Sequence, residues 1–243
     1  MSIPTDFDLA AWRSFRLDSG AHDAAANGIS AMEAVAWLAG EPHSDRPACS
    51  CPVIGRFVIR LNDAMPDAER QRLLPYLPRL IGTNAPEFYQ ARGDFLAWQA
   101  VTVFTPNALR SAGKIDQADQ LQALPLHDFA KARTLLRSCG YSGLWSASAS
   151  FAASAAADAL RSGGGSGGGV GASPQTSSSA TAPAAATAAS AAAEAAKEPL
   201  TPWSPAFAAL DSVLAIGPAG PGLTSEVAAR VQAYGELLAG KAA

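Results

Sequence analysis

The sequence contains few cysteines, histidines, aromatic residues and charged residues. Among its 243 residues are three cysteines and three histidines, while 7% of the residues are aromatic and 16% are charged. The net charge of −3 provides no general attraction for nucleic acid or anionic lipid. A run of about 18 strongly apolar residues, which a membrane-spanning helix needs, is missing from the sequence. We therefore expect no membrane contact and no binding of nucleic acid.

The first residues and the cysteines both bear on the compartment. The stretch MSIPTDFDLAAWRSFR has acidic residues where a signal peptide has basic ones, and no apolar segment follows it. Cys49, Cys51 and Cys139 form a sparse, odd-numbered set, which is typical of reduced thiols rather than of a disulfide framework. These patterns predict a soluble, cytoplasmic protein.

Short helices with defined ends dominate the first half of the chain. Ser30 and Glu33 have the spacing of a capping box, and Gly40 followed by Pro42 ends the predicted helix. A second helix is predicted over residues 52–65, where the apolar residues recur at helical spacing. Further short helices are predicted up to about residue 140, broken by prolines and including a separate one from Thr105 to Gly113. The fold class is therefore all-α, an irregular bundle of short helices.

Composition divides the chain into four parts. Residues 1–27 are predicted to be a weakly ordered lead-in with a short helix near residues 9–15, and residues 28–161 a helical core domain. Residues 162–200 are a low-complexity Ala/Ser/Gly linker, in which the alanine-rich end is predicted to be an isolated helix or spacer. Residues 201–243 contain two short amphipathic helices that are not stable alone, so they must dock on the core, pair with another copy or bind a partner.

A polar junction at residues 41–52 is the candidate site. It contains five residues with chemical potential: His43, Asp45, Arg46, Cys49 and Cys51. A zinc site needs four ligands. His43, Cys49 and Cys51 would supply three of them and Cys139 or Asp45 the fourth, although the Cys-x-Cys spacing is tighter than is usual for zinc-binding cysteines. A Cys–His nucleophilic site is a second interpretation, although it lacks a recognisable third partner. The third is a structured loop, in which Ser44 or Asp45 caps backbone amides and the cysteines pack as small apolar residues.

An arginine-rich surface over the following helices is one further interpretation. Six arginines stand against four acidic residues between positions 45 and 79, which leaves an excess of two positive charges. Nucleic-acid binding normally needs a clearer positive face, so we interpret these helix faces as solvated. No cofactor and no bound metal is expected from the sequence.

The stretch MEAVAWLAGEPHSDRPACSCPVIGRFVIRLNDAMPDAERQRLLPYLPRLIGT resembles an uncharacterised family of bacterial and bacteriophage proteins. The resemblance covers residues 30–125 and includes the Ser-Asp-x-Pro-x-Cys junction, the Pro-Val-Ile helix start, Pro-Arg-Leu-x-Gly-Thr and the stretch beginning Thr-Pro-x-x-Leu-Arg. Arg46 stands where members of the family often have histidine. The resemblance implies a phage or mobile-element connection and brings no activity, cofactor or partner.

Two functions follow as hypotheses. The first is a non-catalytic helical interaction or assembly protein that reaches a protein partner, or a second copy, through its C-terminal helices. The linker would raise the effective concentration for that contact. The alternative is a metal-binding or thiol-dependent enzyme centred on the 43–51 junction.

Overall fold

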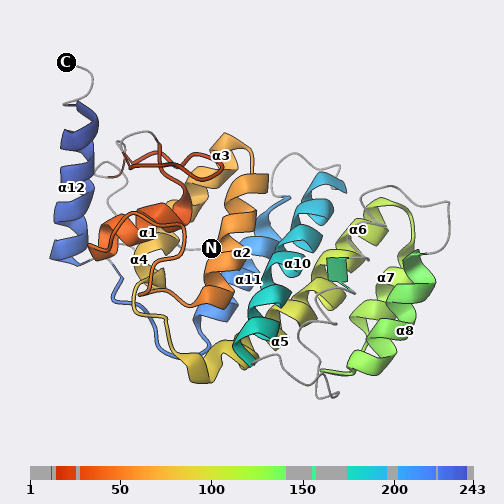
Figure 1. The fold of residues 1–243 in the computed structure, drawn as a ribbon. Helices are drawn as coiled ribbons and strands as arrows, with labels where there is room; N and C mark the ends of the chain where they lie inside the picture. The colour runs from red at the N-terminus through yellow and green to blue at the C-terminus, as the bar shows by residue number, and fades with distance from the viewer. Residues whose placement is uncertain are drawn as a thin grey trace. The chain divides into compact units, whose positions relative to one another are not determined.

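A computed structural model describes residues 12, 15–25, 28–140, 155–156, 174–195, 202–222 and 224–239 (Figure 1). Within these ranges every regular element is a helix, so the predicted all-α class of short helices is confirmed. No helix in the described ranges is long and apolar enough to cross a membrane. Most of the short helix predicted near residues 9–15, and the glycine-rich stretch 162–173, lie outside the described residues.

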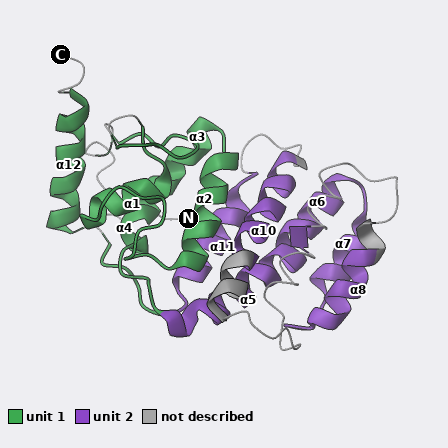
Figure 2. Ribbon diagram, viewed as in Figure 1, with its two compact units in different colours: residues 1–85, 217–243 green, residues 86–216 purple. Residues whose placement is uncertain are grey.

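The chain forms two compact units, which differ from the predicted domains (Figure 2). Unit 1 combines residues 1–85 with residues 217–243, and unit 2 comprises residues 86–216. The sequence predicts one core over residues 28–161 followed by a linker. The division differs because helices from the C-terminal third are part of both units, a long-range pairing that no local pattern reports.

Unit 1 contains the helices whose ends the sequence marks best. Its elements are α1 (Ala31–Ala39), α2 (Pro52–Ala64), α3 (Asp67–Arg70), the 3-10 helix η2 (Gln71–Tyr76), α4 (Leu77–Leu80) and α12 (Ser225–Ala239). The predicted capping box at the start of α1 is present, and Gly40 ends the helix with a φ of 72°. Pro75 and Pro78 fall where α3 gives way to the 3-10 turns and α4, as their missing amides require.

Unit 2 is built on one long helical path. Its elements are η3 (Pro86–Phe88), α5 (Tyr89–Gln99), the π-helix η4 (Ala100–Phe104), α6 (Thr105–Ser111), α7 (Ile115–Gln122), α8 (Phe129–Gly140), α10 (Pro174–Ala195) and α11 (Ser204–Leu214). The sequence predicts that Thr105 caps a separate helix. Instead α5, η4 and α6 are continuous, and Thr105 Oγ1 donates a 2.8 Å hydrogen bond to the carbonyl of Ala100. The π turn just before Pro106 accommodates the amide that this proline lacks.

Helix α10 is the clearest departure from the sequence-based expectation. The alanine-rich segment is helical, but it is packed against α5, η4 and α6 rather than isolated. Ala182, Ala185, Ala188 and Ala191 are at most 2% exposed. Alanine makes up half of this helix, and no charged residue lies between positions 174 and 193, so other helices can approach it closely from several sides.

Helix α12, the blue helix in Figure 1, packs beside α1 in unit 1. Its buried side chains are Val227, Val231 and Tyr234, which follow the i, i+4, i+7 spacing of a helix lying in a groove. Trp37 Nε1 donates a 2.9 Å hydrogen bond to the carbonyl of Arg230. The Tyr234 ring lies 4.4 Å from the ring of Phe15 and 5.7 Å from that of Trp37, centroid to centroid. The C-terminal helix therefore completes the core of unit 1.

Candidate functional site

A non-helical segment, residues 15–25, crosses unit 1 and is here called the strap. Its backbone is held mainly by side chains from the helices around it. Gln71 both donates to and accepts from Leu17, with two bonds of 2.9 Å, and Asn62 Nδ2 donates to the carbonyl of Asp18. Asp63 accepts from the amide of Gly20. Because these anchors belong to α2 and η2, rigid elements fix the position of an irregular segment.

Glu33 binds the strap at His22. One carboxylate oxygen of Glu33 accepts the His22 amide at 2.8 Å, and the other lies 2.9 Å from His22 Nδ1 and 2.8 Å from the amide of Ser30. The Glu33 side chain is only 2% exposed. Burial would raise the pKa of Glu33, but the hydrogen bonds from Ser30 and His22 outweigh it, so the pKa lies below its ordinary value. The carboxylate is therefore ionised at neutral pH.

An ionised carboxylate is only an acceptor, so Nδ1 of His22 must be the donor. The neutral ring then has its proton on Nδ1 and its lone pair on Nε2. The imidazole packs against Gly28, where a Cβ would come within 2.6 Å of Nε2 and which has a φ of 126°. A side chain at position 28 would displace the ring, so glycine is required there. The His22 side chain remains 15% exposed.

His43 joins the same cluster from the polar junction. Its Nε2 donates a 2.7 Å hydrogen bond to the carbonyl of His22 and lies 3.8 Å from Glu33 Oε1. Two of the three histidines in the chain therefore meet at one buried carboxylate. We call His22, Glu33 and His43 the imidazole–carboxylate cluster.

The other four residues predicted for the junction do not join this cluster. Arg46 is exposed, with Nε 3.8 Å from Asp45 Oδ1, and its amide is capped by Ser44 at 3.0 Å. The amide of Cys51 donates to Thr83 Oγ1 at 3.0 Å, and Cys51 is fully buried at the start of α2. These contacts are those of a structured loop, the third of the sequence interpretations.

Cys49 is held by Glu41 in a setting that suppresses thiol reactivity. Glu41 accepts the amides of Ala48 and Cys49 at 2.6 and 2.8 Å. Burial of the thiol, together with the charge of Glu41, raises the pKa of Cys49 to about 12. A thiolate nucleophile needs the opposite shift, so the geometry does not favour the thiol-dependent site.

A metal centre at the junction is not favoured by the geometry either. The part of the chain that the structure describes holds no group of three or more His, Cys, Asp or Glu side chains that could bind a metal ion. Cys139, the proposed fourth ligand, lies in the last turn of α8, and its side chain is not among those described.

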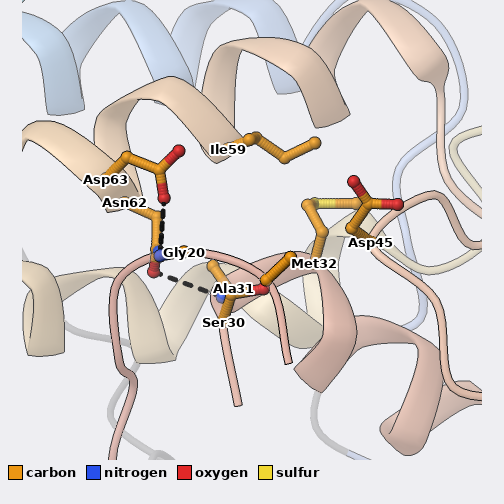
Figure 3. A pocket seen from close by; sticks show the side chains of 9 residues that line it. Gly20, Ser30, Ala31, Met32, Asp45, Ile59, Asn62 and Asp63 are labelled. Atoms are coloured by element: carbon orange, nitrogen blue, oxygen red, sulfur yellow. Dashed lines mark hydrogen bonds between the residues drawn. The ribbon is translucent and has the colours of Figure 1, made fainter. Parts of the chain in front are cut away.

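A small cavity of about 140 Å³ borders the strap on another side (Figure 3). Asp63 and Asn62 project into it from α2, and Asp45 lies across from them beside Met32 (Figure 3). Gly20 and Ala21, the two residues before His22, also line this cavity. None of the three residues of the imidazole–carboxylate cluster does.

Sequence reasoning missed His22 and assigned Glu33 only a capping role. His22 lies in a stretch without periodicity, and its partner is 11 residues away. The one signal in the sequence is that Glu33 is the single charged residue in the otherwise apolar stretch AMEAVAWLA, where a carboxylate needs a partner. No family model, curated protein or solved structure matches this chain.

Proposed function

We propose that unit 1 carries an acid–base site, in which the His22 imidazole transfers a proton and Glu33 orients the imidazole. The hydrogen bond of 2.9 Å between His22 Nδ1 and Glu33 is the observation that supports this function. Because Glu33 already accepts two backbone amides, its position is fixed before any ligand arrives. The reactive residue is then His22 rather than a cysteine of the junction, and His43 supports the strap.

The chemistry of such a pair is general-base catalysis. The Nε2 lone pair takes a proton from a water molecule as the water oxygen bonds to an acyl carbon, and the imidazolium that forms is stabilised by Glu33. The same proton then passes from Nε2 to the leaving oxygen as the ester C–O bond breaks. A positioned base of this kind contributes about 10²- to 10⁴-fold to a rate.

Hydrolysis of p-nitrophenyl acetate by the purified full chain tests this proposal. We expect the wild-type chain to accelerate the release of p-nitrophenolate and His22→Gln to lose at least about tenfold of that acceleration. His127→Gln is the matched control, because His127 belongs to unit 2 and stacks on Phe129. Equal rates for His22→Gln and the wild-type chain would show that His22 is not a base.

A non-catalytic helical interaction or assembly protein is the second candidate function. It is supported by α12, whose side chains at positions 227, 231 and 234 are buried beside α1, a packing that the same helix of a second copy would reproduce by exchange. We expect the native mass of the wild-type chain to rise with protein concentration. The Val231→Asp variant should stay monomeric. A monomer at every concentration would rule out this route to self-association.

Both candidates share one biological setting in this proposal. The resemblance of residues 30–125 to bacterial and bacteriophage proteins supports a phage or mobile-element role. A cytoplasmic location, expected from the sparse cysteines, is part of the same proposal.

A further inference from the structure

We propose that Tyr234 of α12 is a positioning residue for His22. This inference rests on the proposed acid–base site and extends it, because it assigns control of the site to a helix about 200 residues further along the chain. The contact that carries it is a 3.1 Å hydrogen bond from the Tyr234 hydroxyl to the carbonyl of Ala25, in the strap.

The anchors of the strap are unevenly distributed around His22. On its N-terminal side, Leu17, Asp18 and Gly20 are all bonded to side chains of α2 or η2. On its C-terminal side, among the described residues 23–25 of the strap, the bond from Tyr234 is the one side-chain anchor. Without it, no side chain would hold the described residues 23–25 of the strap.

The hydroxyl of Tyr234 keeps the proton that it donates to the Ala25 carbonyl. Tyr234 is 2% exposed, and its burial, followed by the negative charges of Asp18 and Glu33, raises its pKa to about 12. The phenol therefore stays protonated, and able to donate, at neutral pH. A buried carbonyl that loses such a donor has no water to replace it, so Ala25 would be left unsatisfied.

Helix α1 positions both α12 and Glu33. Trp37 of α1 donates to the carbonyl of Arg230, and the Arg230 guanidinium lies over Gly40 at the end of α1. Glu33 lies in the first turn of the same helix. Glu33, which holds the strap at His22, and Tyr234, which holds it at Ala25, are therefore both placed by α1.

Tyr234→Phe separates the hydroxyl from the packing of the ring. The phenyl ring keeps its contacts with Phe15 and Trp37, so only the bond to Ala25 is lost. In nitrogen-15 spectra of the full chain we expect the His22 Nδ1–H proton to exchange with solvent about tenfold faster, while the Trp37 Nε1–H signal stays in place. Tyr89→Phe, which removes a tyrosine hydroxyl from unit 2, is the matched control and should change neither signal.

Three results would overturn the assignment or separate it from the proposed function. An unchanged His22 signal in Tyr234→Phe overturns it, and so does a shift of the Trp37 signal, because α12 would then have left α1. If Tyr234→Phe loosens His22 as expected but His22→Gln leaves ester hydrolysis unchanged, Tyr234 positions His22 and the acid–base function is wrong.

Discussion

The ring of His43 is hydrogen-bonded to the backbone of His22, since His43 Nε2 lies 2.7 Å from the His22 carbonyl oxygen. A carbonyl oxygen only accepts, so the proton lies on Nε2 of His43. The bond joins the strap to the loop after α1, and the Glu33 carboxylate lies 2.9 Å from a nitrogen of the His22 ring and 3.8 Å from one of the His43 ring. The loop that contains the cysteines thus contributes to the site through its histidine.

The tautomer of His22 is the most direct prediction. We expect the neutral ring to carry its proton on Nδ1, because ionised Glu33 accepts there. Long-range proton–nitrogen spectra of the full chain above the titration range distinguish the two tautomers. A ring protonated on Nε2 would contradict the assigned donor.

Glu33→Gln should destabilise unit 1 at neutral pH by about 2 kcal/mol, since one of the three amide or imidazole donors then faces an NH₂ group. The pKa of Glu33 is lower in the folded chain than its ordinary value of 4.5, so the unfolded chain binds more protons in acid. Stability that is present above pH 4.5 is therefore lost as the pH falls through the folded pKa. Urea unfolding at a series of pH values should show a weaker acid dependence in Glu33→Gln, and parallel curves would contradict this.

Cys49 should react slowly with iodoacetamide. A pKa of about 12 in place of 9.0 lowers the thiolate fraction by about a thousandfold near neutral pH. Glu41→Gln removes the neighbouring charge, so its labelling should be faster, although burial still limits it. Mass spectrometry of labelled peptides gives both rates. Rapid labelling of Cys49 in the wild-type chain would mean that the thiol is not suppressed.

Gly40→Ala should cost about 1–2 kcal/mol of stability, more than the change in backbone preference alone. Gly40 has a φ of 72°, and a Cβ there would come within 2.6 Å of Arg230 Cζ. Gly82→Ala is a close control, with a φ of 75° and nothing within 4 Å of the added Cβ. The difference between the two variants in urea unfolding measures the docking of α12, and equal losses would show that Arg230 does not contribute.

Ala188→Leu should destabilise unit 2 by about 1–3 kcal/mol, because Ala188 is fully buried in α10 and the larger side chain overpacks its surroundings. Ala184→Leu, at a half-buried position of the same helix, should cost less. Thermal unfolding of both variants provides the comparison. If Ala188→Leu is tolerated without loss of stability, α10 is a loosely held spacer, as its composition suggested.

The sequence predicts what local chemistry decides. Ser30, Glu33 and Gly40 mark the ends of α1 through contacts within a few residues, and the apolar stripe of α2 is visible from its spacing. The cluster escapes such reasoning because His22 meets Glu33 across an irregular segment, and because Tyr234 reaches Ala25 from 209 residues away. The burial of α10 is missed for another reason: alanine fits equally well in a solvated spacer and in a tightly packed interior.

Unit 1 draws on both halves of the chain, with residues 86–216 inserted between them. During synthesis the ribosome makes Phe15 and Trp37 well before Tyr234, which packs on both. Those two aromatic side chains lack the Tyr234 ring as a partner while residues 86–216 are translated. A nascent chain of this protein is therefore a candidate substrate for chaperones that bind exposed apolar surface, and a product that stops before α12 cannot complete the unit that was begun first.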